Sequence, residues 1–255
     1  MFRLVLRKVC RDFRNIVDDF NLEFDLNSIE ISMEQNVQKN KREISVILAS
    51  SGELHHVIYR EHKKGCQMVY RKKKILLENL NFHQVFCEEM GYILRHQNSL
   101  MSSFSLTILN TDEKFMEMLK GSRNREKLKV RHFQIKADES QAFEVLRLIS
   151  SKYLKSVQLD FKKPTEVSID KLDSLYQLRN AEEFYTKNIV ISGSVTNLGH
   201  FSGTEVTMFK VTIEELVYLK EVIFRDSGNF KSLLSDFPAL SQLPAVYSSL
   251  QTLRG

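Results

Sequence analysis

The chain lacks several residue types and motifs on which common protein functions depend. It has no Trp, three Pro, nine Gly and three Cys in 255 residues. Cys10, Cys66 and Cys87 are odd in number and unpatterned, as expected in a reducing compartment. Few glycines, and no G-x-G-x-x-G or P-loop motif, argue against a nucleotide-binding enzyme. Because no apolar run is long enough to cross a bilayer and no signal-peptide pattern occurs, we expect an intracellular protein, cytoplasmic or nuclear.

Catalytic patterns are missing as well. The sequence has no G-x-S-x-G, no H-E-x-x-H and no paired C-x-x-C. Its acidic pairs are adjacent in sequence, and adjacent side chains on a helix diverge, so the pairs do not form acid/base dyads. These pairs are Asp18-Asp19, Glu88-Glu89, Glu182-Glu183 and Glu214-Glu215. We therefore expect that the chain is not an enzyme and that it needs no cofactor.

One group of potential metal ligands, His55, His56, His62 and Cys66, lies close together in the sequence. Zinc sites usually need two close pairs of ligands. Neighbouring residues of a strand point to opposite faces, so His55 and His56 do not form such a pair. Only His62 and Cys66 remain well spaced. The sequence predicts a solvated hairpin here, without a metal site.

The net charge of +5 is concentrated in one segment. Residues 60–74 hold seven Lys and Arg residues against the single acid Glu61, while the rest of the chain is close to neutral. A solvated loop is the interpretation we favour, with nuclear import and nucleic-acid contact as alternatives. Nucleic-acid binding is the least favoured, because Tyr70 is the only nearby aromatic residue for base stacking. The basic patch consists of Arg71, Lys72, Lys73 and Lys74.

The stretch 127–161 organises the rest of the chain. Its two ends alternate apolar and polar residues, as strands do. Between them, Asp138 and Gln141 have the spacing of a capping box, and apolar residues then recur on one helical face. Such a strand–helix–strand unit predicts two parallel strands joined by a right-handed crossover. The residues expected in the core are Phe133, Ile135, Ala142, Phe143, Leu146, Ile149, Tyr153, Val157 and Leu159.

A repeat is visible around this unit. The spacing L-x-x-L-x-L of leucine-rich repeats begins at Val130, Leu154 and Val206. The markers of successive repeats recur every 24 to 27 residues, at Ile108, Ile135, Leu159, Phe184 and Val211. The Asn or Cys that normally follows such a strand is absent, so the repeats are degenerate.

The fold class predicted from this repeat is α/β. We expect a degenerate leucine-rich-repeat-like β/α solenoid, and an ordinary open α/β sheet is the alternative. Parallel strands, adjacent in one curved sheet, are predicted near 105–109, 130–136, 155–160 and 206–211.

The segments on either side complete the predicted architecture. Residues 4–20 have the period of an amphipathic helix. Residues 28–71 have period two and predict a four-stranded antiparallel meander that caps the open edge of the sheet. Helices are expected over 75–98 and 112–119, around Leu172, Leu175 and Leu178, and after a Thr212–Glu215 capping box.

Several segments resemble a known family. Val5–Asp18 resembles the second half of an F-box, in the form found in a large nematode family. The segments Leu128–Tyr153, Leu154–Leu159, Leu178–Phe184 and Thr212–Val222 resemble the FTH domain that follows the F-box in that family. The resemblance covers essentially the whole chain. It implies a partial F-box-like helical segment at 1–26, a β-meander connector or cap at 27–74, an FTH-like β/α repeat domain at 75–240, and a loosely ordered tail at 241–255.

The resemblance also implies a function. It indicates a substrate-recognition adaptor of a cullin-type (SCF) ubiquitin ligase, which binds a Skp-type adaptor and an unknown protein substrate. Positions that match the retained F-box half, and that would contact the adaptor, are Leu4, Val5, Leu6, Val9 and Cys10. An F-box normally begins with a Leu-Pro segment and a helix, which would precede Met1 of this sequence. We therefore expect this chain to bind the adaptor weakly or not at all. The alternative is a binding module without ligase contact, including a nuclear one that uses residues 71–74.

Overall fold

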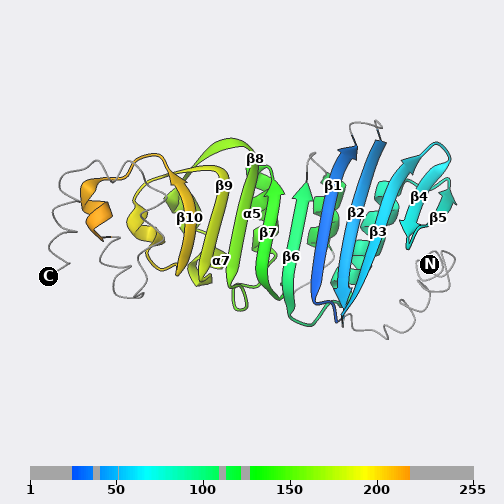
Figure 1. Cartoon of the computed structure of the whole chain (residues 1–255), viewed down its shortest axis with the longest axis horizontal. Helices are drawn as coiled ribbons and strands as arrows, with labels where there is room; N and C mark the ends of the chain where they lie inside the picture. Colours follow the sequence, from blue (N-terminus) through cyan, green and yellow to red (C-terminus); the bar gives the residue numbers. More distant parts are fainter. Residues whose placement is uncertain (1–24, 37–40, 51, 109–112, 122–126, 219–255) are drawn as a thin grey trace. The chain divides into compact units, whose positions relative to one another are not determined.

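The computed structural model describes residues 25–36, 41–50, 52–108, 113–121 and 127–218 (Figure 1). They belong to two compact units. The larger contains the described residues up to Gly193 together with His200–Phe209, and the smaller contains Ser194–Gly199 and the described residues from Lys210. The helix predicted over 4–20, the predicted adaptor contacts and the tail from 241 lie outside the described residues. No helix of the described ranges is long and apolar enough to cross a membrane.

The larger unit is built on one ten-stranded sheet, in the order β10-β9-β8-β7-β6-β1-β2-β3-β4-β5. The strands are β1 Ser28–Asn36, β2 Lys41–Ser50, β3 Glu53–His62, β4 Gly65–Tyr70, β5 Lys73–Glu78, β6 Met101–Ile108, β7 Val130–Ala137, β8 Ser156–Ser168, β9 Glu183–Ser192 and β10 Gly203–Met208. The helices of this unit are α3 Phe82–His96, α4 Glu113–Gly121, α5 Glu139–Arg147, α6 Ile169–Asp173 and α7 Tyr176–Asn180. The smaller unit has a 3-10 turn, η1 Val195–Leu198, and a helical segment at 213–218.

The fold is mixed α/β, with an open and mostly parallel sheet. β1 joins its two halves, since it pairs antiparallel with β2 and parallel with β6. The predicted meander is present as β1–β4, and it continues the same sheet as the parallel strands. The boundary predicted between residues 74 and 75 falls within β5.

The central prediction of parallel pairing is confirmed. β7 and β8 pair in parallel, with His132 opposite Ser156 and Ala137 opposite Phe161. The parallel strand predicted near 206–211 is present as β10, but it begins and ends three residues earlier and pairs with β9 instead of β8. β9 was not predicted as a strand and lies between β8 and β10. The marker Val211 therefore lies outside any described strand.

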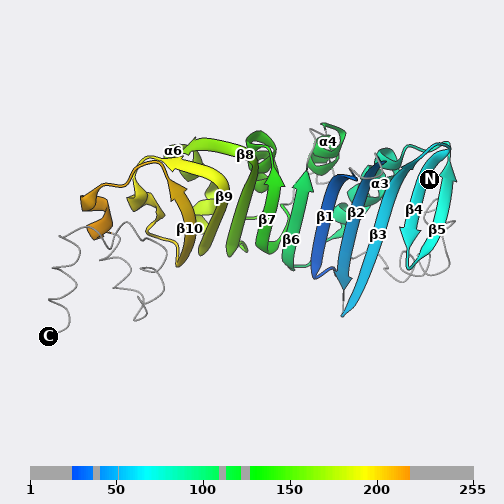
Figure 2. The same cartoon turned by 45° about the horizontal axis from the view of Figure 1, so that its top comes forward.

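The core lies on one side of the sheet, under the helices (Figures 1 and 2). Strand side chains alternate between this buried side and an uncovered side. One cross-strand row on the buried side is Ile29, Phe104, Phe133, Val157 and Phe184, each at most 1% exposed. The next row contains Leu106, Ile135 and Leu159. Removing these side chains from water is the main stabilising contribution of the sheet.

Two buried glutamines of the larger unit form hydrogen bonds with backbone groups far away in the sequence. The Gln97 side chain pairs with the backbone of Leu26, accepting from its N–H and donating to its carbonyl, both at 3.1 Å. Gln177 donates in the same way to the Ile149 carbonyl at 3.0 Å. These amides therefore satisfy buried backbone groups of segments that are far away in the sequence. The repeat pattern predicts Asn or Cys after each strand, so Gln97 and Gln177 were not predicted to have this role.

Two predicted helix starts need correction. Asp138 is the N-cap of α5, but its side chain makes no capping bond and instead accepts from Lys162 Nζ at 2.8 Å. Gln141 is buried within the apolar face of α5, so it does not reach back to close the predicted box. The predicted helix 75–98 begins only at α3, because residues 73–78 pair as β5 and Asn81 caps the helix.

The other helices predicted within the described residues are present, the last of them as far as it is described, to residue 218. α4 matches the prediction for 112–119, and the leucine pattern at Leu172–Leu178 forms two short helices, α6 and α7. In the smaller unit the predicted capping box is formed. Glu215 N donates to Thr212 Oγ1 at 3.3 Å, and Thr212 N donates to Glu215 Oε2 at 2.9 Å.

Truncation of the central core is expected to be costly. Phe133→Ala should lower the free energy of unfolding by about 3–5 kcal/mol and Leu159→Ala by about 2–5 kcal/mol, because each leaves a cavity under the helices. Gln134→Ala, on the uncovered side next to Phe133, serves as the control and should change it little. Urea midpoints measure all three, and equal midpoints for Phe133→Ala and Gln134→Ala would contradict the assigned faces.

Candidate protein-interaction surface

The side of the sheet away from the helices is uncovered by any described element, and we call it the open face (Figure 1). Strand register shows which side chains lie on it. Glu30, Ser105, Gln134, Gln158 and Tyr185 form one continuous row across β1 and β6–β9. Residues two positions before and after this row in each strand point to the same side of the sheet. The open face therefore extends across these strands.

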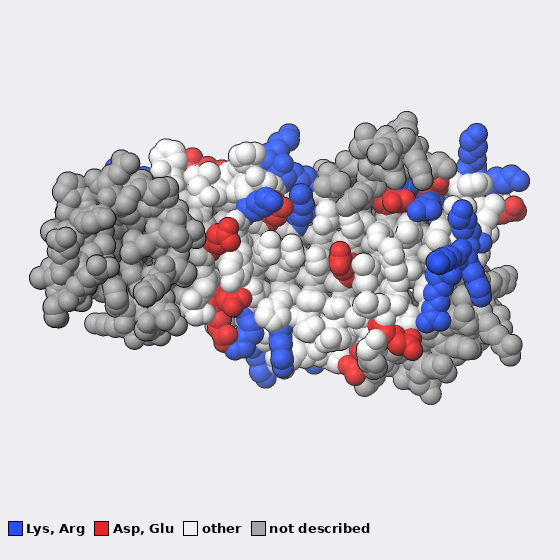
Figure 3. Space-filling model, viewed as in Figure 1, with Lys and Arg blue, Asp and Glu red and all other residues white. Residues whose placement is uncertain are grey.

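The centre of the open face is made of small or uncharged polar side chains. We call this region on β1 and β6–β8 the polar strip. Its members are Ser28, Glu30, Ser32, Ser103, Ser105, Thr107, His132, Gln134, Lys136, Ser156, Gln158 and Asp160. Figure 3 shows the centre of this face almost free of charged side chains. Nine of the twelve members are Ser, Thr, Gln or His, three are charged (Glu30, Lys136 and Asp160), and Ser156 and Asp160 are buried.

The few charges in the polar strip are largely balanced. Lys136 Nζ lies 3.5 Å from Asp160 Oδ2, and the Asn188 amide donates to Asp160 Oδ1 at 3.1 Å. Asn188 has φ 59° at the point where the pairing of β8 and β9 shifts register, a conformation that Asn tolerates well. Of the strip's acidic and basic residues, Glu30 alone has no ion pair with another described residue.

The structure separates the four residues of the basic patch. Arg71 and Lys72 form the two-residue turn between β4 and β5, while Lys73 and Lys74 lie on opposite faces of β5. Lys74 is opposite Val69, on the open face, whereas Lys73 is opposite the buried Tyr70. The sequence run is therefore not one continuous surface patch.

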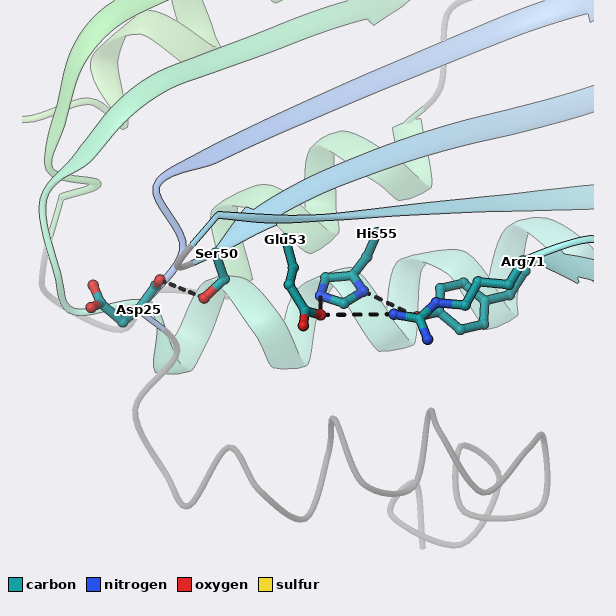
Figure 4. Close-up of polar contacts among 6 residues, drawn as sticks. Asp25, Ser50, Glu53, His55 and Arg71 are labelled. Atoms are coloured by element: carbon teal, nitrogen blue, oxygen red, sulfur yellow. Dashed lines mark hydrogen bonds and ion pairs between the residues drawn. The ribbon is translucent and has the colours of Figure 1, made fainter.

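Arg71 takes part in a separate polar cluster at the start of β3 (Figure 4). Its guanidinium lies 5.4 Å from the centre of the Tyr70 ring and 3.7 Å from Glu53 Oε2. His55 Nδ1 shares a 3.0 Å hydrogen bond with the Tyr70 hydroxyl. Burial lowers the pKa of His55; Glu53 opposes this shift and Arg71 adds to it.

The remaining metal candidates do not converge. His56 lies on the open face, where Nε2 shares a 2.8 Å hydrogen bond with Ser45 Oγ, and His55 points to the buried side. Cys66 is fully buried, and His62 is opposite Gly65 in the β3–β4 pairing. Within the described residues, no group of three or more His, Cys, Asp or Glu side chains could hold a metal ion.

A buried carboxyl group lies between α3 and the sheet. Tyr59 donates to Glu89 Oε2 at 2.5 Å, while Glu89 Oε1 has no hydrogen-bond partner. Burial raises the pKa of Glu89 to about 8, against the opposing effect of the Tyr59 hydrogen bond. Burial, together with Glu89, also raises the pKa of Cys66 to about 12, so this thiol is not a reactive nucleophile. Tyr59, Cys66 and Glu89 are all buried, so this cluster is a structural feature of the core.

Comparison with protein families identifies the chain. The family model described as FTH domain matches residues 109–242, more than half of the 255 residues. This chain belongs to the FTH-domain family. No curated protein and no solved structure matched it. The match confirms the FTH resemblance of the sequence and covers α4, β7–β10 and α5–α7, so this FTH domain contributes much of the open face.

Glu89 should make stability fall as pH rises. The pKa of Glu89 is higher in the folded state than the ordinary 4.5, so protonated Glu89 favours folding. This contribution to the free energy of unfolding is fully present below about pH 4.5 and is lost as pH rises through about 8. Glu89→Gln cannot ionise and keeps an oxygen that accepts from Tyr59. It should raise the free energy of unfolding at pH 8 by about 1–3 kcal/mol and have little effect at pH 5. Glu117→Gln, exposed on α4, is the control; equal effects of Glu89→Gln at both pH values would refute this account.

The turn between β4 and β5 holds two residues in an unfavourable conformation. Arg71 and Lys72 have φ of 46° and 66°, and a turn with two positive φ values favours Asn-Gly. The double change Arg71→Asn and Lys72→Gly should therefore stabilise the FTH protein by about 1–2 kcal/mol. The control is Lys63→Asn with Lys64→Gly, which removes the same charge at two positions without a positive φ. It should not increase stability. Thermal midpoints compare the two pairs, and equal shifts would mean that strain is not the cause.

Proposed function

We propose that this FTH protein is a protein-interaction module that recognises the substrate of a cullin-type (SCF) ubiquitin ligase. The observation that carries the proposal is the open face, which is wide, uncovered and nearly uncharged in its centre, in a chain of the FTH family. FTH membership supports an F-box-associated module for protein binding.

The composition of the polar strip supports a role in protein contact. Interface centres are depleted in charged residues, because an unpaired charge is costly to bury. Ser and Thr lose little side-chain entropy when a partner covers them, whereas Lys and Glu lose much more. Ser105 and Gln134, directly opposite one another on β6 and β7, are representative of the strip. We interpret β6–β10 as degenerate solenoid repeats, since solenoids commonly bind partners on an extended sheet surface.

The proposed mechanism is positional. The amino-terminal residues that resemble an F-box would bind the Skp-type adaptor, and the open face would hold the substrate. Holding both together raises the effective concentration of the substrate at the ubiquitin-carrying enzyme. The chain itself makes and breaks no covalent bond in this mechanism. Positions proposed for the adaptor contact are Leu4, Val5, Leu6, Val9 and Cys10.

Reconstituted ubiquitylation tests both halves of the proposal. The chain is combined with purified Skp-type adaptor, cullin and ubiquitin-carrying enzyme, and substrates in an extract are identified by chain-dependent ubiquitylation. Ser105→Arg with Gln134→Arg should reduce that modification at least about tenfold while adaptor binding is kept. The matched control makes the same residue changes on the helix side, at Ser140 and Gln84, both exposed.

The outcomes separate the ligase role from the surface. Leu6→Lys with Val9→Lys should abolish adaptor binding and leave direct substrate binding unchanged. Failure of the unaltered chain to bind the adaptor would favour a binding module without ligase contact. Equal modification by the open-face variant and its helix-side control would show that the open face does not recognise substrates.

A further inference from the structure

The open face changes character over β2–β5. In place of Ser, Thr and Gln it carries aliphatic side chains, which we call the aliphatic stripe. Register places them on the open face, because Ser32 of the polar strip is opposite Ser45, which is opposite Ile58, which is opposite Val69. The stripe consists of Ile47, Ala49, Leu54, Ile58, Val69 and Leu76.

The members of the stripe are neighbours on the sheet surface. Ile58 and Val69 are directly opposite, Ile47 is diagonal to Ile58, and Leu76 is diagonal to Val69, distances at which side chains touch. None of the six is buried; Leu54 is 72% exposed and Leu76 is 37% exposed. A contiguous group of uncovered aliphatic residues beside a polar surface is typical of a binding site.

Cations flank the stripe, together with one carboxylate, Glu78, on the same face of β5. Lys74 lies on the open face opposite Val69, and Lys72 is exposed at the tip of the adjoining turn. Neither side chain has an ion pair with another described residue. Arg60, on the same face, is held by Glu43 at 2.9 Å. Figure 3 shows Lys and Arg side chains gathered at this end of the open face. Lys72 has a φ of 66° in this turn, a conformation that Gly adopts with less strain.

The opposite end of the open face carries two carboxylates and one cation, Lys187, which is opposite Asp160. Glu183 and Glu205 lie there, in the rows that cross β9 and β10. Partial burial and these two carboxylates raise the pKa of Tyr185, which lies between them on β9. An acidic partner would be repelled from this end and attracted to β3–β5. The distribution of charge therefore favours one position and one orientation on the sheet.

We propose that the aliphatic stripe binds a short acidic segment of the substrate, in which aliphatic residues are interspersed with Asp and Glu. The aliphatic residues pack on Ile58 and Val69, and the carboxylates pair with Lys72 and Lys74. The inference rests on the proposed function and names the chemistry that the open face recognises. Nucleic acid suits the site less well, because an aliphatic surface offers nothing to stack on a base; Tyr59 and Tyr70 lie on the buried side.

Peptide binding to the full chain tests this proposal. Three fluorescent peptides of about twelve residues are compared with a single-stranded RNA of similar charge. The first peptide contains aliphatic and acidic residues, the second aliphatic residues and Lys, and the third acidic residues and Ser. At about 150 mM salt, the acidic aliphatic peptide should bind at least about tenfold more tightly than the other three. RNA binding more tightly than every peptide, or equal binding of all peptides, would overturn the proposal.

Matched variants identify the residues responsible. Ile58→Thr with Val69→Thr keeps β-branched side chains on the strands and should weaken peptide binding about tenfold or more. Thr107→Ser, in the polar strip, is its control and should have no effect. Lys72→Gln with Lys74→Gln should weaken binding and its salt dependence, whereas Lys63→Gln with Lys64→Gln, at the other end of the β3–β4 hairpin, should not.

The two proposals fail separately. Circular dichroism and urea midpoints show whether each variant is folded, and only folded variants are compared. Unchanged peptide binding by folded Ile58→Thr with Val69→Thr would overturn the assignment of the stripe, while adaptor binding and substrate modification would still test the proposed function. Loss of adaptor binding with full peptide binding would overturn the ligase role and leave the stripe in place.

Discussion

The structure depends on the in-register pairing of β6, β7 and β8. This register brings Phe104, Phe133 and Val157 into one buried row, and a shift of one residue would turn that row toward water. The Phe104 and Phe133 rings lie 6.0 Å apart, so the row is also packed along its length. Fixing the buried row fixes the opposite one, because strand side chains alternate. The open face is thus a direct consequence of how the core is packed.

The open face has three chemical regions in sequence across the sheet. Aliphatic residues with cations lie on β2–β5, mostly uncharged polar residues on β1 and β6–β8, and Glu183 and Glu205 with one cation, Lys187, on β9 and β10. The antiparallel strands and the FTH strands present one continuous open face, since β1 links them in one sheet. In the proposed function, this continuity lets a segment outside the matched FTH span contribute to substrate recognition.

Periodicity was sufficient to predict much of this fold. Alternation identified β1–β4, β7 and β8, and the parallel crossover was correct because Phe133 and Leu159 stand out as buried positions. Pairing between distant segments was not visible, which is why β9 was missed and β1 was not expected beside β6. The role of Gln97 and Gln177 depends on backbone groups far away in sequence. The aliphatic stripe could be identified only from the strand register, because the sequence alone is equally consistent with Ile58 and Val69 in the core.

The central claim is that substrates bind to the open face. Hydroxyl-radical footprinting of the full chain, alone and with a substrate found by ubiquitylation, measures this directly. The account predicts protection of Leu54, Ile58 and Leu76 and unchanged labelling of Tyr176, which is exposed on the helix side. Protection of Tyr176 with unchanged labelling of the aliphatic stripe would contradict it.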